Sequence, residues 1–358
     1  HYCPWARYAM SELREILGET VTRLFSDLCT KDLLEKCDGG EWPAELWATV
    51  EENGLTRPLL PEDKGGVDAG WQAAYVILHA AGRYAAPIPL AETILAGWLL
   101  DQAEMDVPEG VLSIVPNSAN VAVTAGAITG SALNVPWASR ADHLVGVARV
   151  NGRLSVYLAS KASIKVKADH NIARDPRDCV SFDGKVEVTA APAEFTSETV
   201  ALYGAMVRSA QMAGALERII EDTLQYTMDR TQFGKQIGKF QVIQQNMAMA
   251  AAEVAAAVMA AQNAFRAAEQ GLPVFEAACA KVLAGEAAGM ATDICHETHG
   301  AIGFTYEHHL HFFTRRLWSW RGEFGAESEW AEQLGRRAAA RGADALWSDI
   351  TERQSANA

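Results

Sequence analysis

One carboxylate, Glu323, stands among tryptophans and glycines in the segment LWSWRGEFG. A carboxylate can take a proton from a substrate when it lies within hydrogen-bond distance of that proton. The same side chain could instead be a solvated acid that pairs with Arg316 or Arg321. The segment therefore carries a candidate general base, and its sequence leaves both interpretations open.

A second candidate site lies in the segment DRTQFGKQIGKFQVIQ, where Arg230 precedes a glycine-punctuated turn and a new helix. An arginine at such a junction can bind a phosphate or pyrophosphate through paired, charge-assisted hydrogen bonds. Gln241, farther along, could give an amide contact to the same extended ligand. The alternative is structural: Arg230 caps the preceding helix and Phe233 fills the core.

A third segment, HETHGAIGFTYEHHLHFFTRR, runs from a helix into a glycine turn. Gly300 and Gly303 allow a backbone to approach a ligand closely, as a cofactor loop requires. No metal site is expected here, because the histidines lack a plausible set of acidic partners. These histidines are His296, His299, His308, His309 and His311.

Composition limits the classes of function. The chain has 358 residues and a formal net charge of −14, with 49% hydrophobic and 21% charged residues. This is the balance of a soluble globular protein. The charge excludes a nucleic-acid partner, because phosphate backbones need clustered Lys and Arg.

Cysteine usage and hydropathy bear on the compartment. The six cysteines form no CxxC pair and no metal spacing, which favours a reducing, cytoplasmic setting. The most membrane-like stretch, MAMAAAEVAAAVMAA, is short and contains Glu253, so a packed soluble helix is expected and no membrane association. No signal peptide is visible, and the polar, aromatic start HYCPWARYAM is assigned to no element of the fold.

The periodicity of apolar residues predicts three domains, mainly α with a central antiparallel β domain. Three- and four-residue spacing predicts an N-terminal helical domain over residues 1–110. Alternation and β-branched residues predict a barrel-like β domain over 111–196, with a hairpin turn in VNGR. Residues 197–358 are expected to form a four-helix bundle that carries the cofactor and oligomer interface. Its predicted helices cover 199–228, 240–270, 274–298 and 327–347.

Together, three segments resemble the acyl-CoA dehydrogenase family. RTQFGKQIGKFQ resembles its Arg-x-x-Phe-Gly signature, and HGAIGFTYEHHLHFFTRR resembles its His-Gly-Gly-x-Gly segment followed by Arg. GLTRPLLPEDKGGVDAG is similar to its N-terminal Pro-Glu-x-x-Gly-Gly loop. The resemblance covers nearly the whole chain and matches the predicted domain order.

This resemblance implies FAD, bound at an interface between the β domain of one subunit and the helical bundle of its neighbour. The implied reaction is α,β-dehydrogenation of an acyl-CoA, with an electron-transferring flavoprotein as acceptor and a homo- or hetero-tetramer as the assembly. The cofactor contacts that it implies are Arg230, Gln232, Phe233, Gln241, Glu297, Gly300, Ala301 and Gly303.

The chain departs from the family pattern in three places. Nothing between Val115 and Gly126 resembles the flavin loop Thr-Glu-Pro-x-x-Gly-Ser-Asp, and Glu297 replaces a glutamine. The family's catalytic acid falls on Phe324, one place after Glu323, and the rival position for the acid falls on Gly204. A shift of one residue turns a helical side chain by about 100°.

Three hypotheses follow. The first is an acyl-CoA dehydrogenase subunit, with bulky or steroid-derived acyl-CoAs among its candidate substrates, whose sister chain supplies the base in a heteromer. The second is a self-sufficient homo-oligomeric enzyme that uses Glu323. The third is a flavin-free structural or regulatory partner on the same scaffold.

Overall fold

Helices form the first part of the chain. The computed structural model describes residues 4–116 and 120–351. The first helix begins at Pro4, so it includes most of the segment HYCPWARYAM, which the sequence assigned to no element. The N-terminal helices are α1 (Pro4–Leu28), α2 (Lys31–Asp38), α3 (Ala44–Glu52), α4 (Gly70–Arg83) and α5 (Leu90–Gln102).

The middle of the chain forms two four-stranded sheets, in the orders β1-β4-β5-β8 and β2-β3-β7-β6. Neighbouring strands are antiparallel except β1 and β4, which are parallel. The predicted VNGR hairpin is confirmed, because Asn151 and Gly152 join β4 to β5 with φ of 50° and 80°. The strands are β1 (Leu112–Ile114), β2 (Asn120–Thr124), β3 (Ala127–Pro136), β4 (His143–Val150), β5 (Arg153–Ser160), β6 (Ile164–Lys167), β7 (Arg177–Lys185) and β8 (Glu187–Ala190).

The C-terminal part is helical again, and its first three helices match the predicted ranges closely. The predicted fourth helix, 327–347, is wrong in its extent, since Gly342 ends α10 at a φ of 84°. A short hairpin of β9 (Thr231–Gln232) and β10 (Lys235–Gln236) joins α6 to α7. The helices are α6 (Thr199–Asp229), α7 (Gln241–Ala268), α8 (Val274–His299), α9 (Leu310–Gly322), α10 (Glu327–Arg341) and α11 (Ala343–Thr351).

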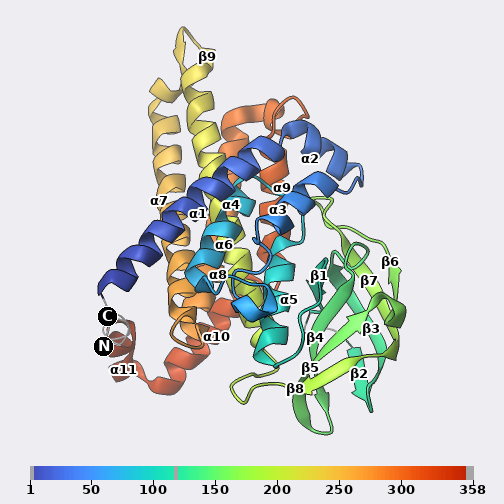
Figure 1. The fold of residues 1–358 in the computed structure, drawn as a ribbon. Helices are drawn as coiled ribbons and strands as arrows, with labels where there is room; N and C mark the ends of the chain where they lie inside the picture. Colours follow the sequence, from blue (N-terminus) through green and yellow to red (C-terminus); the bar gives the residue numbers. More distant parts are fainter. Residues whose placement is uncertain (1–3, 117–119, 352–358) are drawn as a thin grey trace.

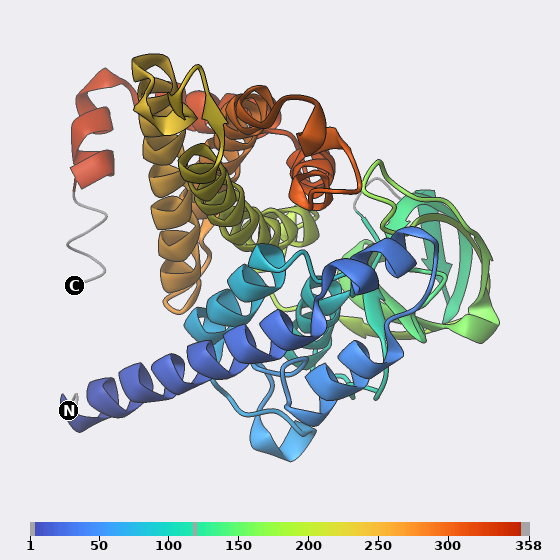
Figure 2. The ribbon, with the colours of Figure 1, turned by 90° about the horizontal axis from the view of Figure 1, so that it is seen from above.

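The β domain lies at one end of the molecule, beside the helices (Figures 1 and 2). One apolar core joins the N-terminal helices, the sheets and the start of α6, and a second fills the space among α6, α7, α8 and α9. The predicted fold class, mainly α with a central antiparallel β domain, is confirmed. The exact domain boundaries stay a prediction.

Helix α7 is the one helix among the described residues that is long and apolar enough to cross a membrane. Its inner face packs into the bundle, where Ala250, Ala257 and Ala261 are fully buried. A single helix of this kind is weak evidence for a membrane span, because core helices of soluble proteins pass the same test.

Candidate active site

A cavity of about 680 Å³ lies between the β domain and the C-terminal helices. The β domain contributes Leu133, Asn134 and residues 169–172, and the end of α9 with the start of α10 contributes the opposite wall. The segment that holds Glu323 therefore borders a cavity of ligand size, as expected of an active site.

The carboxylate of Glu323 is held by two arginines. Arg177 at the start of β7 donates from Nε to Oε1 at 2.7 Å and from Nη2 to Oε2 at 3.1 Å. Arg208 of α6 adds a contact of 2.7 Å to Oε2. The expected partners were wrong: Arg316 pairs with Asp175 and Arg321 pairs with Glu327.

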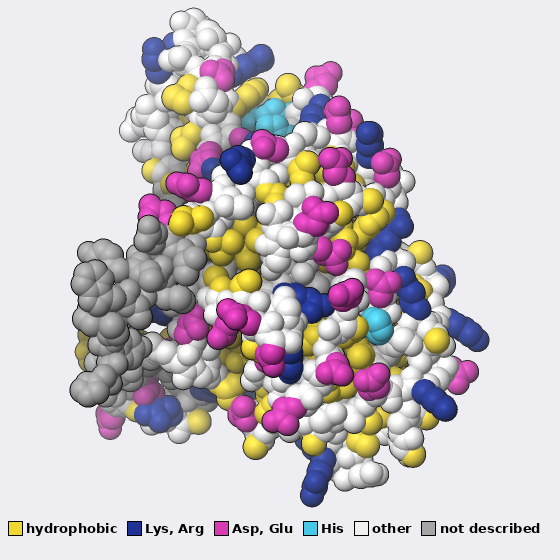
Figure 3. Space-filling model, viewed as in Figure 1, with side chains coloured by type: hydrophobic (Ala, Val, Ile, Leu, Met, Phe, Trp, Pro, Cys, Tyr) yellow, Lys and Arg dark blue, Asp and Glu magenta, His cyan; other side chains and the backbone are white. Residues whose placement is uncertain are grey.

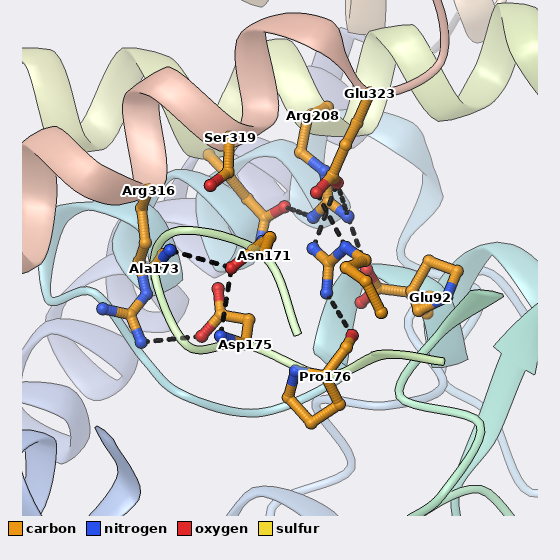
Figure 4. Close-up of polar contacts among 12 residues, drawn as sticks. Glu92, Asn171, Ala173, Asp175, Pro176, Arg208, Arg316, Ser319 and Glu323 are labelled. Atoms are coloured by element: carbon orange, nitrogen blue, oxygen red, sulfur yellow. Dashed lines mark hydrogen bonds and ion pairs between the residues drawn. The ribbon is translucent and has the colours of Figure 1, made fainter. Parts of the chain in front are cut away.

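These charges belong to a buried network that connects three parts of the fold. Arg208 also pairs with Glu92 of α5 at 2.6 Å, and the two side chains are only 2% and 3% exposed. Figure 4 shows Glu323 pointing from the end of α9 toward Arg208, with Glu92 on the other side of the network. Sequence reasoning missed this network, although Glu92 and Arg208 are lone charges within apolar helices, a pattern that signals buried pairs.

The network determines what Glu323 can do chemically. Although burial alone would raise the pKa of this carboxyl, Arg177 and Arg208 lower it from 4.5 to about 2. A carboxylate this acidic is a weak proton acceptor, and its oxygens are already occupied by guanidinium groups. The geometry therefore contradicts the assignment of Glu323 as the general base, and makes it part of a structural ion pair.

Lys281 fixes the neighbouring backbone from the side of α8. Its buried ammonium donates to the carbonyl oxygens of Arg321 and Gly325, each at 2.7 Å. Burial lowers the pKa of Lys281 to about 8. Two hydrogen bonds thus hold the loop on both sides of Glu323 in one conformation.

Phe324 and Gly204, the two positions at which the resemblance would place the base, lie in direct contact. A Cβ atom added to Gly204 would overlap the aromatic ring of Phe324. Phe324 has a φ of 56°, a strained value for a bulky residue, and its ring also lies 5.7 Å from the Arg208 guanidinium carbon. A phenyl ring therefore fills the place where the resemblance puts a carboxylate.

This contact gives a test of its own. Gly204→Ala is expected to destabilise the fold by about 1–3 kcal/mol, because the methyl group overpacks against Phe324. Gly335→Ala is the matched control: Gly335 is a helical glycine with no atom within 4 Å of the added Cβ, so alanine should stabilise by up to about 1 kcal/mol. Urea unfolding of both variants measures the difference. An equal change in the free energy of unfolding in the two variants would show that the Phe324 ring moves away from the added methyl group without an energetic cost.

The tryptophans near Glu323 have different roles. Trp320 is buried in the second core. Trp318 is half-buried, lines the cavity and donates from Nε1 to Thr292 at 3.0 Å. The cavity wall is therefore partly aromatic.

The predicted cofactor residues around Arg230 lie far from this cavity, at the tip of the α6–α7 pair (Figure 1). Arg230, Gln232 and Gln241 are exposed, and Phe233 is 91% exposed at a φ of 50°. Phe233 therefore does not fill the core. One chain does not bring these residues to its own cavity, because none of them is among the residues that line it.

The second group of predicted cofactor residues lies at the end of α8, which contains Glu297, and in the turn after it, which contains Gly300, Ala301 and Gly303. Glu297 and Ala301 are exposed and Gly303 is buried, whereas Gly300 has a φ of 64° and no neighbouring atom within 4 Å of the place where a Cβ would lie. A ligand could approach the backbone closely at Gly300, as predicted for a cofactor loop.

The histidines beside this loop form an aromatic stack. His299 stacks on Tyr226 with 4.3 Å between the ring centres, and His296 stacks on Phe304 with 4.0 Å between the ring centres. Burial lowers the pKa values of His296 and His308 to about 4, so both rings are neutral at pH 7. Within residues 4–116 and 120–351, no cluster of three His, Cys, Asp or Glu side chains is arranged to hold a metal ion.

Comparison with known proteins gives a family match for the C-terminal helices and similar proteins over most of the chain. The family model described as "Acyl-CoA dehydrogenase, C-terminal domain" matches residues 197–339. Acyl-CoA dehydrogenase IpdE2 of Mycolicibacterium smegmatis is 26% identical over 314 residues, which are 86% of this chain and 93% of the relative.

Solved structures share the whole architecture. The ChsE4-ChsE5 complex from Mycobacterium tuberculosis aligns with a TM-score of 0.85 and 20% identity, over 92% of this chain and 98% of that one. A structure described as the "FAD complex of PigA" aligns with a TM-score of 0.80 and 18% identity, over 92% and 98%. With the sequence matches above, these likenesses lead to one conclusion: residues 197–339 form an acyl-CoA dehydrogenase C-terminal domain, within a chain whose overall fold those solved structures share.

Proposed function

We propose that this chain is one subunit of a heteromeric, FAD-dependent acyl-CoA dehydrogenase, and that a sister chain supplies the catalytic base. The observation that carries the proposal is the contact between Phe324 and Gly204. Both family positions for the base lack a carboxylate, and the nearest acid, Glu323, is bound by two arginines. Neither of these two positions therefore supplies a proton acceptor to the chain's own cavity.

The hairpin and the Gly300 loop fit part of a dinucleotide. Residues 230–239 contain three cations, Arg230, Lys235 and Lys239, and no acid. Arg230 suits a pyrophosphate, Phe233 offers an exposed ring, and Gly300 offers accessible backbone. The exposed Glu297 must turn away from the phosphates. Bound FAD would supply the hydride acceptor for α,β-dehydrogenation of the acyl-CoA.

The chain's own cavity does not fit the phosphates of FAD or of CoA. Its lining includes the carboxylates of Asp169, Glu198 and Glu329, and none of the three forms an ion pair with a residue that the structure describes. Arg177, the one arginine among the described lining residues, is neutralised by Glu323. A pyrophosphate placed here would meet net negative charge. The chain's contribution is therefore to complete a sister chain's flavin site with its own hairpin.

Names of relatives support a heteromer and a bulky substrate. One solved neighbour is the ChsE4-ChsE5 complex, and another is described as the "Tcur3481-Tcur3483 steroid ACAD G363A variant". We propose that this chain, too, acts in a heteromer on a bulky substrate. The proposed assembly is a hetero-tetramer in the cytoplasm, and the proposed electron acceptor is an electron-transferring flavoprotein. A steroid-derived acyl-CoA is the proposed substrate class.

Co-expression tests the proposal. The chain purified alone is expected to hold little FAD and to show no dehydrogenation, whereas the complex with a homologue from the same operon should be yellow and active. The absorbance near 450 nm and acyl-CoA-dependent reduction of a dye measure the two properties. Full activity of the lone chain would favour the self-sufficient enzyme, and a colourless complex would favour the flavin-free partner.

A further inference from the structure

Five histidine side chains, which we call the histidine array, surround the turn that joins α8 to α9. His296 and His299 lie in the last turn of α8, and His308, His309 and His311 lie just before α9 or in its first turn. Their rings contact one another, with 4.6 Å between the centres of His299 and His308 and 4.7 Å between those of His308 and His309. The reaction proposed above gives this array no role.

Most of the array is buried with no acceptor for an added proton. His296, His299 and His311 are buried, and each has at least one ring nitrogen without a hydrogen-bond partner among the described residues. His299 Nδ1 lies 2.8 Å from the carbonyl oxygen of Cys295, so Nδ1 carries the hydrogen and the unpartnered Nε2 carries none. A proton added to Nε2 would create a buried, unpaired charge, which is strongly unfavourable.

His308 connects the array to the start of α9. Its Nδ1 accepts a hydrogen bond of 3.1 Å from the backbone N–H of Leu310, the first residue of α9. Protonation of Nδ1 would turn this acceptor into a donor and break the bond. Burial lowers the pKa of His308 and of His296 from 6.5 to about 4, so both rings bind a proton more tightly once this segment opens.

The turn Gly300–Phe304 packs directly on the array. A Cβ atom added to Gly303 would lie 3.1 Å from His299 Cβ and 3.2 Å from His296 Nδ1, and the Phe304 ring stacks on His296. In Figure 3, histidine atoms reach the surface between α2 and the tip of the α6–α7 pair, so water has access to part of the array. The conformation of the turn therefore depends on rings that must stay neutral.

Charged neighbours do little to accept further protons on the array. Asp222 of α6 is the one carboxylate, in the part of the chain that the structure describes, that binds a ring of the array: it contacts His309 at 2.7 Å and Arg218 at 2.8 Å. Asp38 of α2 is bound by Arg315, whose positive charge also acts on His311. The other titratable neighbours are Asp293 of α8, Lys31 and Glu35 of α2, Tyr226 of α6, and Tyr306 and Glu307 of the loop.

We propose that the histidine array is an acid-sensitive switch, in which protonation of the rings opens the turn Gly300–Phe304 and the start of α9. The closed segment binds these protons poorly and the open segment binds them well, so a fall in pH from 7 to 5 favours the open form. This opening concerns the chain by itself. Its consequence, release of flavin from the Gly300 backbone, rests on the proposed function.

Hydrogen–deuterium exchange of the full-length chain between pH 7 and pH 5 tests the inference, after correction for the intrinsic pH dependence of exchange. The opening equilibrium of residues 298–312 should rise at least about tenfold relative to that of α7, because His296 and His308 gain protons on opening. The slope of its logarithm against pH counts these protons and should approach about two. The pKa of Glu323 confines the effect of that residue to pH values below 4.5.

Two variants each remove one titrating ring. His308→Asn keeps an acceptor oxygen for the N–H of Leu310, and His296→Gln keeps a hydrogen-bonding group for Thr314 Oγ1, which lies 2.8 Å from His296 Nε2. Each variant should lower the slope by about one. His170→Asn is the matched control, because His170 is exposed in the β domain, outside the array, and this variant should leave the slope unchanged.

An opening equilibrium that stays constant from pH 7 to pH 5 in the wild-type chain would overturn the inference, and so would a slope that neither variant lowers. In the co-expressed complex, an ultrafiltrate at pH 5 should contain released flavin, and less of it for His308→Asn. Retention of flavin despite an open turn would overturn the consequence for the cofactor. A complex without flavin at pH 7 would count against the proposed function and leave the exchange result of the lone chain intact, so the two proposals fail separately.

Discussion

Glu323→Gln is expected to lower the free energy of unfolding by about 3–5 kcal/mol, among the largest effects available to one substitution in this chain. The change keeps the shape of the side chain and removes its charge. Arg208, 2% exposed, would then keep Glu92 as its directly paired carboxylate, whereas Arg177, 5% exposed, would keep none among the described residues. Urea unfolding followed by tryptophan fluorescence measures the loss.

Glu329→Gln is the matched control, because Glu329 borders the same cavity but is exposed and forms no ion pair with a described residue. It should change stability by less than about 0.5 kcal/mol. The outcome also separates two roles of Glu323. A catalytic base would lose turnover and keep its stability, whereas the ion pair predicts a loss of stability. A fully stable Glu323→Gln variant would contradict the network.

The pH dependence follows from the same ion pairs. The pKa of Glu323 is lowered from 4.5 to about 2 in the folded chain. The carboxylate therefore contributes its full stabilisation above pH 4.5 and loses it as the pH falls from 4.5 to 2. Over this window the wild-type chain should lose roughly 3 kcal/mol more than the Glu323→Gln variant. Parallel acid-unfolding curves would contradict the lowered pKa.

Periodicity was enough to predict the long helices and the hairpin turn of the β domain. Residues 199–228, for example, carry apolar side chains at helical spacing, and these side chains are buried along α6. Asn151 and Gly152 can form a tight turn without contacts from the rest of the fold. The break at Gly342 was missed because the helical pattern continues across it, although a glycine there can adopt positive φ.

The site was predicted less completely, because its contacts join residues that are distant in sequence. Glu323 meets Arg177 and Arg208 only because the β domain packs against α6 and the end of α9. Counting residues along the sequence places the two expected positions of the acid at Phe324 and Gly204, where this chain has no carboxylate. The contact between Phe324 and Gly204 depends on how α6 packs against the loop after α9, and counting does not show it. Exposure of Phe233, in contrast, agrees with a motif that acts on another subunit.

Arg230→Ala is expected to weaken FAD binding by the co-expressed complex about 100-fold, close to 3 kcal/mol. The basis is the loss of two charge-assisted hydrogen bonds to a pyrophosphate, each worth about 1.5–3 kcal/mol. Arg230 is exposed and ends α6, and its side chain forms no ion pair with a described residue, so the fold should be unaffected. Flavin occupancy after gel filtration and a titration of the stripped complex measure the effect.

Arg230→Lys distinguishes geometry from charge. Lysine keeps the positive charge but cannot form the forked pair of hydrogen bonds, so its affinity for FAD should lie between those of wild type and Arg230→Ala. Arg153→Ala, an exposed arginine at the start of β5, is the control for general loss of charge and should bind FAD normally. If both Arg230 variants retain full affinity while the complex stays yellow, the sister chain holds the flavin without this hairpin. The role of this chain in the enzyme would then be structural.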